Sequence, residues 1–260
     1  MPVEPSLRLK RRKFLVELEA TVTAIEGHEI NPIQLKQNHV QLQHMSLDEH
    51  SEEKPHFFLP YPDFPQPDED DEIDELRDAL DDEGTCFTRP MDRARTVYST
   101  WSSYAFDWAP GKPQATLWSA GCVADHTPYK PVIDHNRQLM FGALDITDIR
   151  QPAGRYPHSK AVIYNNWMAK DGEILRGELL AVLRLMLGRL KKTHLIKHMT
   201  APVLMLSFMG KRARAVESYY DGRDLYVRIS RFYDFPEETE SAFKTFAEWY
   251  HGDPEGNTLA

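Results

Sequence analysis

The feature that most constrains the fold is a short apolar run, residues 203–208 (VLMLSF), which Pro202 precedes and Gly210 follows. A run that is apolar on both alternating sets of side chains is typical of a strand covered on both faces, in the middle of a sheet. Such a strand needs neighbours on both sides and helices above and below. We therefore expect an α/β protein with a central mixed sheet in which 203–208 is a buried strand.

The surrounding segments supply partners for this strand. Asp221-Gly222 separates two alternating runs, 213–220 and 223–232, and Asp-Gly between such runs is the strongest short-range hairpin signal. Apolar residues at helical spacing predict a helix over 173–192, and a second amphipathic pattern predicts one over 236–251. The sequence thus predicts a C-terminal hairpin and packing helices.

The N-terminal part of the chain predicts less regular structure. Residues 14–25 alternate and contain β-branched side chains, which favours a strand, and residues 31–67 contain six prolines, which favours a linker. Residues 71–83 predict either an acidic helix or a disordered segment, and residues 95–104 (RTVYSTWSSY) predict a strand. We expect residues 1–90 to be an N-terminal extension with a proline-rich linker and an acidic segment, and residues 91–260 to be a single compact domain.

Charge is distributed unevenly along the chain. The net charge is −9, but residues 68–83 hold eleven acids and one arginine, whereas residues 176–231 hold twelve Lys and Arg against four acids. Such a split indicates either a surface for a polyanion with an acidic arm, or two solvated faces. The basic residues that would contact nucleic-acid phosphates are Arg184, Arg189, Lys191, Lys192, Lys197, Lys211, Arg212 and Arg214.

Composition bounds the compartment and the cofactors. Cys86 and Cys122 are the only two cysteines, and no spacing typical of a zinc site is present. No signal-peptide or membrane-helix pattern is found. We expect a cytoplasmic or nuclear protein, and the cysteines give no sign of a zinc site.

Two residues have the chemistry of catalytic groups. Glu178 begins the predicted helix among apolar neighbours, where it would act as an acid or base or merely cap the helix. Ser207 ends the buried strand, where it would act as a nucleophile if His194 or His198 served as its base, or merely bond to the backbone. Asp145, with Asp148, would bind a cationic substrate or a metal beside Glu178, or bond to the backbone.

The predicted hairpin gathers acidic and aromatic residues on one face. A two-residue turn would set Glu217 opposite Tyr226, and alternation would place Tyr219, Asp224 and Arg228 on the same face. Carboxylates beside tyrosine rings suit a guanidinium or an amine. The alternative is a cross-strand pair between Glu217 and Arg228 on a solvated face.

Several stretches resemble a widespread family of fungal hypothetical proteins that includes the arginine-containing cyclodipeptide synthases. They are GELLAVLRLML (177–187), residues 198–234, WYHGDPEGNT (249–258), Arg-Tyr-Pro (155–157) and VIYNNW (162–167), and the resemblance spans residues 95–258. It implies an enzyme that takes two aminoacyl-tRNAs, one of them arginyl-tRNA, and releases a cyclic dipeptide. Because aminoacyl esters are already activated, such an enzyme would need no cofactor, neither ATP nor a metal. The basic residues would then hold tRNA, and Glu217, Tyr219, Asp224 and Tyr226 would hold the arginyl side chain. Glu178 would move a proton, and Ser207 would accept an aminoacyl group in a covalent mechanism.

Two other functions fit parts of the sequence. One is a nuclease-like enzyme of the PD-(D/E)xK type, with Asp145 and a glutamate binding magnesium, although the expected Glu-x-Lys is missing from the next strand. The other is a protein-interaction module whose acidic arm binds a partner or the basic surface.

Overall fold

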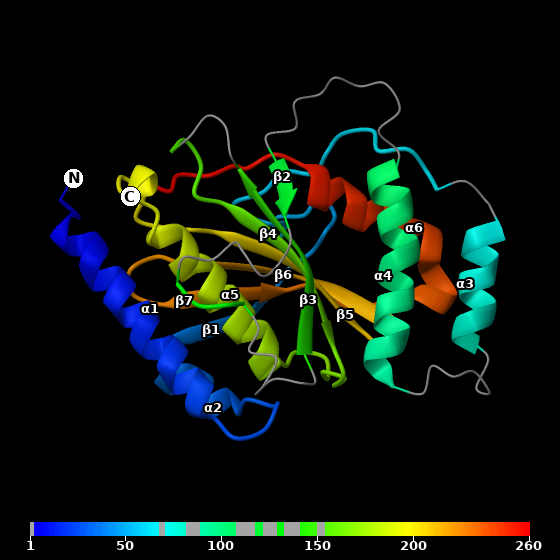
Figure 1. Ribbon diagram of the computed structural model, residues 1–260, viewed down its shortest axis with the longest axis horizontal. Coiled ribbons are helices and arrows are strands. Elements are labelled where there is room, and N and C mark those ends of the chain that lie inside the picture. Colours follow the sequence, from blue (N-terminus) through cyan, green and yellow to red (C-terminus); the bar gives the residue numbers. More distant parts are fainter. Residues whose placement is uncertain are drawn as a thin grey trace.

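A single mixed sheet runs through the molecule (Figure 1). The computed structural model describes residues 3–67, 71–81, 89–107, 118–121, 129–132, 141–149 and 154–260. Seven strands follow the order β1-β7-β6-β5-β4-β3-β2, and β8 pairs with β6 off this path. Their bounds are β1 (Val40–His44), β2 (Trp118–Gly121), β3 (Phe141–Ile149), β4 (Ser159–Asn165), β5 (Val203–Met209), β6 (Arg212–Tyr220), β7 (Leu225–Ile229) and β8 (Tyr233–Asp234).

The predicted buried strand is confirmed as β5. All seven of its residues are buried, with β4 parallel on one side and β6 antiparallel on the other. The parallel pair is joined by a crossover through helix α5 (Arg176–Leu190), as parallel neighbours require. The α/β class expected from the sequence is therefore correct.

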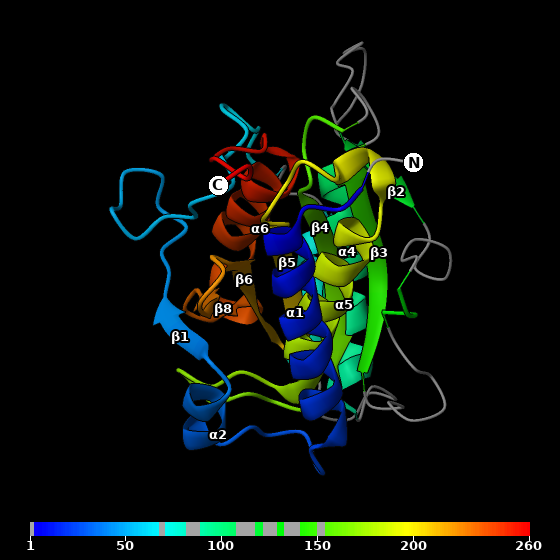
Figure 2. The same cartoon turned by 90° about the vertical axis from the view of Figure 1, so that its left-hand side faces the viewer.

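Helices cover both faces of the sheet (Figure 2). Helix α1 (Ser6–Ala24) packs on α5 over one face, and α4 (Pro90–Asp107) and α6 (Phe235–His251) lie over the other, with α3 (Asp71–Asp81) against them. The short helices α2 (Pro32–Gln37) and η2 (Thr193–Leu195) complete the described elements. Alternate β5 residues enter different cores: Val203 and Met205 join that of α1 and α5, whereas Leu204 and Leu206 join that of α4 and α6.

Two segments predicted as strands are helices. In α1 the buried residues include Leu15, Leu18 and Val22, and in α4 they include Val97 and Trp101. These spacings of three and four residues place them on one side of a helix. The Val, Thr and Tyr content of both segments pointed to strands, but packing of a helical stripe on the sheet prevailed over β propensity.

Described elements on the two sides of the predicted boundary near residue 90 pack together. β1 extends the sheet by pairing in parallel with β7, and Met45 and Phe58 are buried in the core beneath α6. Residues 71–81 of the acidic segment form α3, with Ile73, Leu76 and Leu80 buried, as the helical alternative predicted. The N-terminal third is therefore part of the same fold.

The predicted hairpin forms, but with a longer turn and a register shifted by two residues. The Asp221 side chain accepts from the backbone N–H groups of Arg223 and Asp224, so the turn uses four residues. Glu217 consequently pairs with Arg228 and Tyr219 with Tyr226. A shift of two preserves which strand side chains share a face. Glu217, Tyr219, Tyr226 and Arg228 therefore still lie on one face, whereas Asp224 falls in the turn.

Candidate functional site

Polar side chains collect where β4 and β5 end, beneath the N-terminus of α5. Asn165 closes β4 and donates through Nδ2 to the Ser207 hydroxyl on β5, at 3.1 Å. Arg214 on β6 is the direct neighbour of Ser207 in the sheet and forms a bidentate ion pair with Glu178, with nitrogen–oxygen distances of 3.1 and 2.6 Å. The structure thus brings together Glu178, Ser207 and Arg214, which the sequence had singled out separately. Ligands of α/β sheets bind at the carboxyl ends of parallel strands, which is where this cluster lies.

The geometry gives Glu178 a different role from the predicted acid or base. Its Oε2 accepts from the Leu175 N–H at 2.8 Å as well as from Arg214, and its side chain is fully buried. Both carboxylate oxygens are therefore bonded, and proton transfer would require breaking a buried ion pair. Glu178 instead fixes the position of the Arg214 guanidinium and caps α5.

Ser207 does not have the surroundings of an activated nucleophile. Its side chain is completely buried and its hydroxyl accepts from Asn165. The suggested bases, His194 and His198, precede the start of β5, whereas Ser207 is near its far end. His198 is itself bonded to Thr258 and to the Gly154 carbonyl. The arrangement is that of a buried serine satisfied by an amide.

A hollow of about 730 Å³ opens over the Arg214 end of this cluster. It is lined by β1, the start of β6, the segment that leads from β7 into α6, and the loop at Asp171 and Gly172. Arg231 in its wall forms two hydrogen bonds with Glu238. Among the residues that the structure describes, no ion pair joins the other charged lining residues Arg212, Asp171, Asp234 and Glu237 to a partner. The hollow therefore offers charges of both signs to a ligand.

The acidic and aromatic groups on one face of the hairpin bond to or stack on other groups of the protein. Glu217 is fully buried and bonds to Arg228 at 2.7 Å and to the Phe57 N–H at 2.8 Å. Tyr219 and Tyr226 stack on each other with ring centroids 5.1 Å apart. A guanidinium does occupy the site, as the residue types suggested, but it is the protein's own Arg228. The alternative of a cross-strand pair is correct, except that the pair is buried rather than solvated.

The two predicted substrate-binding aspartates lie apart from this face. Asp224 is in the hairpin turn and approaches the His39 ring at 3.3 Å. Asp145 stands in β3 opposite Val162 of β4, and its side chain is outside the described part of the structure.

The predicted basic surface is divided. Arg184 and Arg189 are buried and bonded inside the protein, Arg184 to Glu19 and Arg189 to the carbonyls of Tyr156 and Pro157. Because α5 returns the chain from the end of β4 to the start of β5, Lys191, Lys192 and Lys197 lie at one end of the sheet. Lys211 and Arg212 lie at the other, about 20 Å away along β5. The described cations do not form one continuous surface.

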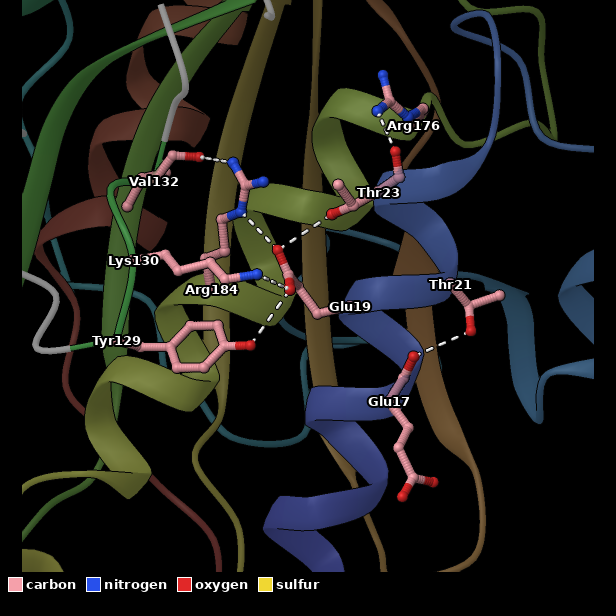
Figure 3. A network of polar contacts seen from close by, with 9 residues as sticks. All are labelled: Glu17, Glu19, Thr21, Thr23, Tyr129, Lys130, Val132, Arg176 and Arg184. Carbon is pink, nitrogen blue, oxygen red and sulfur yellow. Dashed lines mark hydrogen bonds and ion pairs between the residues drawn. The ribbon is translucent and has the colours of Figure 1, made fainter.

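Arg184 belongs to a network that the sequence did not predict (Figure 3). Glu19 of α1 accepts from Arg184 at 3.0 Å, from Lys130 at 2.6 Å and from the Tyr129 hydroxyl at 3.2 Å. Burial raises the pKa of Glu19, but the hydrogen bonds and charges of Lys130 and Arg184 outweigh it, so the pKa is lowered overall. The network joins α1, α5 and the segment 129–132.

Sequence reasoning also missed Lys160 of β4, a completely buried cation. Its ammonium donates to the carbonyls of Trp249, Tyr250 and Gly252 at 3.0, 2.8 and 2.6 Å, and burial lowers its pKa well below the usual value. These carbonyls end α6, so Lys160 caps that helix. Its place near the start of a strand gave no signal of this role.

Neither sequence nor structure comparison identifies a relative. No family model, no curated protein and no solved structure matches this chain. Within the described segments, no helix is long and apolar enough to cross a membrane, and no group of three or more metal-ligand side chains comes together.

Proposed function

We propose that the hollow binds the aminoacyl end of arginyl-tRNA and that the protein forms an arginine-containing cyclic dipeptide. The observation that carries this proposal is the presence of both acidic and basic side chains in the lining of the hollow. Asp171, Asp234 and Glu237 can hold a guanidinium or ammonium group, while Arg212 can bind an anionic or ester oxygen. An aminoacyl ester of arginine carries both kinds of group close together.

Formation of the cyclic dipeptide from aminoacyl esters needs no redox partner and no nucleoside triphosphate. The α-amine of one aminoacyl group attacks the ester carbonyl of the other, which forms a C–N bond and breaks the C–O bond to the ribose. The proton from the amine ends on the leaving hydroxyl. A second attack closes the ring and releases the second tRNA. A carboxylate that accepts the amine proton would assist both steps, and Asp234 and Glu237 are in the wall of the hollow.

The structure changes two parts of the mechanism expected from the sequence. A covalent intermediate on Ser207 is not part of this proposal, because that hydroxyl is buried and bonded to Asn165. The tRNA contact is also smaller than expected, since only Lys211 and Arg212 of the predicted basic set stand outside the interior at this end of β5. Fewer phosphate contacts imply a shallower dependence of binding on salt.

The test is expression in a host with normal aminoacyl-tRNA pools, followed by mass spectrometry for cyclic dipeptides that contain arginine. Ribonuclease treatment of a cell-free reaction should abolish product formation. We expect the double variant Asp171→Asn, Glu237→Gln to lose at least about tenfold in product yield, because it removes two charge-assisted contacts to the cationic group. The exposed Glu75 on α3, replaced as Glu75→Gln, is the matched control.

Absence of any arginine-containing cyclic dipeptide from the wild-type protein contradicts the proposal. Equal yields from the double variant and the Glu75→Gln control would show that the hollow does not take part in the reaction.

A further inference from the structure

Arg214 lines the hollow with a guanidinium that is largely buried but only partly bonded. The Arg214 side chain is 1% exposed, and its Nε and Nη2 are both used by Glu178. No acceptor for its remaining nitrogen, Nη1, is found among the described residues. Nη1 is not one of the fully buried unpaired atoms, and Arg214 lines the hollow, so this nitrogen is available to donate to a ligand there.

Arg212 stands beside Arg214 in the same wall. The two residues are separated by one position on β6, so their side chains leave the same face of the strand roughly 7 Å apart. The Phe232 ring packs against both, with its centroid 5.2 Å from the guanidinium carbon of Arg212 and 4.9 Å from that of Arg214. This contact holds both planar cations in place without neutralising either.

We infer that Arg212 and Arg214 form an anion subsite for a phosphate or carboxylate of the ligand, and that Glu178 is its positioning residue. Glu178 orients Arg214 through two of its nitrogens and leaves Nη1 for the ligand. Arginine, unlike lysine, carries several donors in one fixed plane, so Arg214 can pair with Glu178 through one edge and still offer Nη1 to an anion.

This subsite narrows the class of ligand that the hollow accepts. We assign the anion to the phosphate next to the terminal ribose of an aminoacyl-tRNA, and this assignment rests on the proposed function. A free amino acid would present a carboxylate instead, so two probes distinguish the sources. Adenosine 5′-phosphate carries the phosphate alone, and L-arginine carries the carboxylate, which its decarboxylated analogue agmatine lacks.

The experiment measures binding of these probes by calorimetry, without turnover. For the wild-type protein we expect binding of adenosine 5′-phosphate, and about tenfold weaker binding after Arg212→Ala, since one charge-assisted contact is lost. Arg223→Ala is the matched control, because Arg223 is 88% exposed in the hairpin turn outside the hollow. If L-arginine binds more tightly than agmatine and the difference disappears in Arg212→Ala, the anion is a carboxylate.

Arg214 is tested by removing the buried pair together. The double variant Glu178→Leu, Arg214→Met avoids leaving one charge unpaired in the interior, which a single replacement would do. We expect it to keep the wild-type circular dichroism and to lose phosphate binding. Arg214→Lys should retain charge but lose at least about fivefold in affinity, because lysine is not a planar donor.

The subsite is wrong if Arg212→Ala and Arg223→Ala bind adenosine 5′-phosphate and L-arginine equally well, or if no anionic probe binds the wild-type protein. Anion binding that depends on Arg212 in a protein that forms no cyclic dipeptide would uphold the subsite and overturn only the proposed function.

Discussion

Burial of single ionisable side chains makes this protein sensitive to acid. His158 is 1% exposed and its Nε2 donates to the Glu255 carbonyl at 2.9 Å, while Nδ1 has no partner among the described residues. Burial is the main cause that lowers the pKa of His158 to about 3. The unfolded chain therefore binds more protons than the folded protein between about pH 6.5 and pH 3.

We predict that this histidine costs stability as the pH falls. The contribution of neutral His158 is present above pH 6.5 and is lost progressively toward pH 3, by about 2–3 kcal/mol at pH 4.5. Urea unfolding at pH 7 and pH 4.5 should show a smaller loss in His158→Gln than in the wild type. His50→Gln, at an 85% exposed side chain, should behave as the wild type does. Equal losses in all three proteins would show that His158 does not titrate in this way.

At the residue scale, the sequence identified the important side chains better than their roles. Glu178, Ser207 and Arg214 do meet, but Arg214 is 36 positions from Glu178, and their pairing follows from strand register and the α5 crossover. The alternative that pairs Glu217 with Arg228 is correct, and it is predictable because the two strands of a hairpin are close in sequence. Their burial depends on the loop containing Lys54, whose carbonyl accepts from Arg228, and no local pattern announces that contact.

Elements were predictable where their pattern was unambiguous. The almost wholly apolar β5, the Asp-Gly hairpin and the helices α5 and α6 are predictable because each combines a clear pattern with a clear start or stop. The segments of α1 and α4 combine helical spacing with β-branched and aromatic residues, so the two signals conflict. Only the packing of α1 on α5, and of α4 on β4 and β5, decides between them.

The docking of α1 on α5 gives a prediction at this scale. Glu19 is completely buried and is the shared acceptor of the network in Figure 3, whereas Glu17 on the same helix is exposed. Glu19→Gln keeps the shape but leaves Arg184 buried without its counter-charge, and we expect it to lower the free energy of unfolding by about 3–5 kcal/mol. Glu17→Gln should change it by less than about 0.5 kcal/mol. Denaturant unfolding measures both, and similar values for the two variants would show that the network does not hold the helices together.

For the molecule as a whole, the distribution of charge along the sequence predicted the charged surfaces of the folded protein poorly. The basic segment 176–231 is folded so that α5 and β5 separate its cations, and Arg184, Arg189, Arg214 and Arg228 are taken into the interior. A run of charges in sequence becomes a surface only if the fold places it on one side, and here a helix-to-strand crossover divides it. The charges offered to a ligand are instead assembled from β6, the loop at residue 171 and the start of α6.

The same long-range assembly predicts how the chain responds to truncation. Leu15, Leu18 and Val22 fill the core on the α5 face, and β1 covers the outer edge of β7. A chain shortened to residues 91–260 would expose the apolar face of α5 and the unpaired edge of β7, and exposed edges of this kind promote aggregation. We therefore expect the shortened chain to lack a cooperative urea transition and to be digested rapidly by protease, and addition of separately produced residues 1–90 to restore protection. The boundary that composition suggested near residue 90 predicts the opposite, a shortened chain that unfolds cooperatively by itself, and that result would show that the N-terminal elements are dispensable to the core.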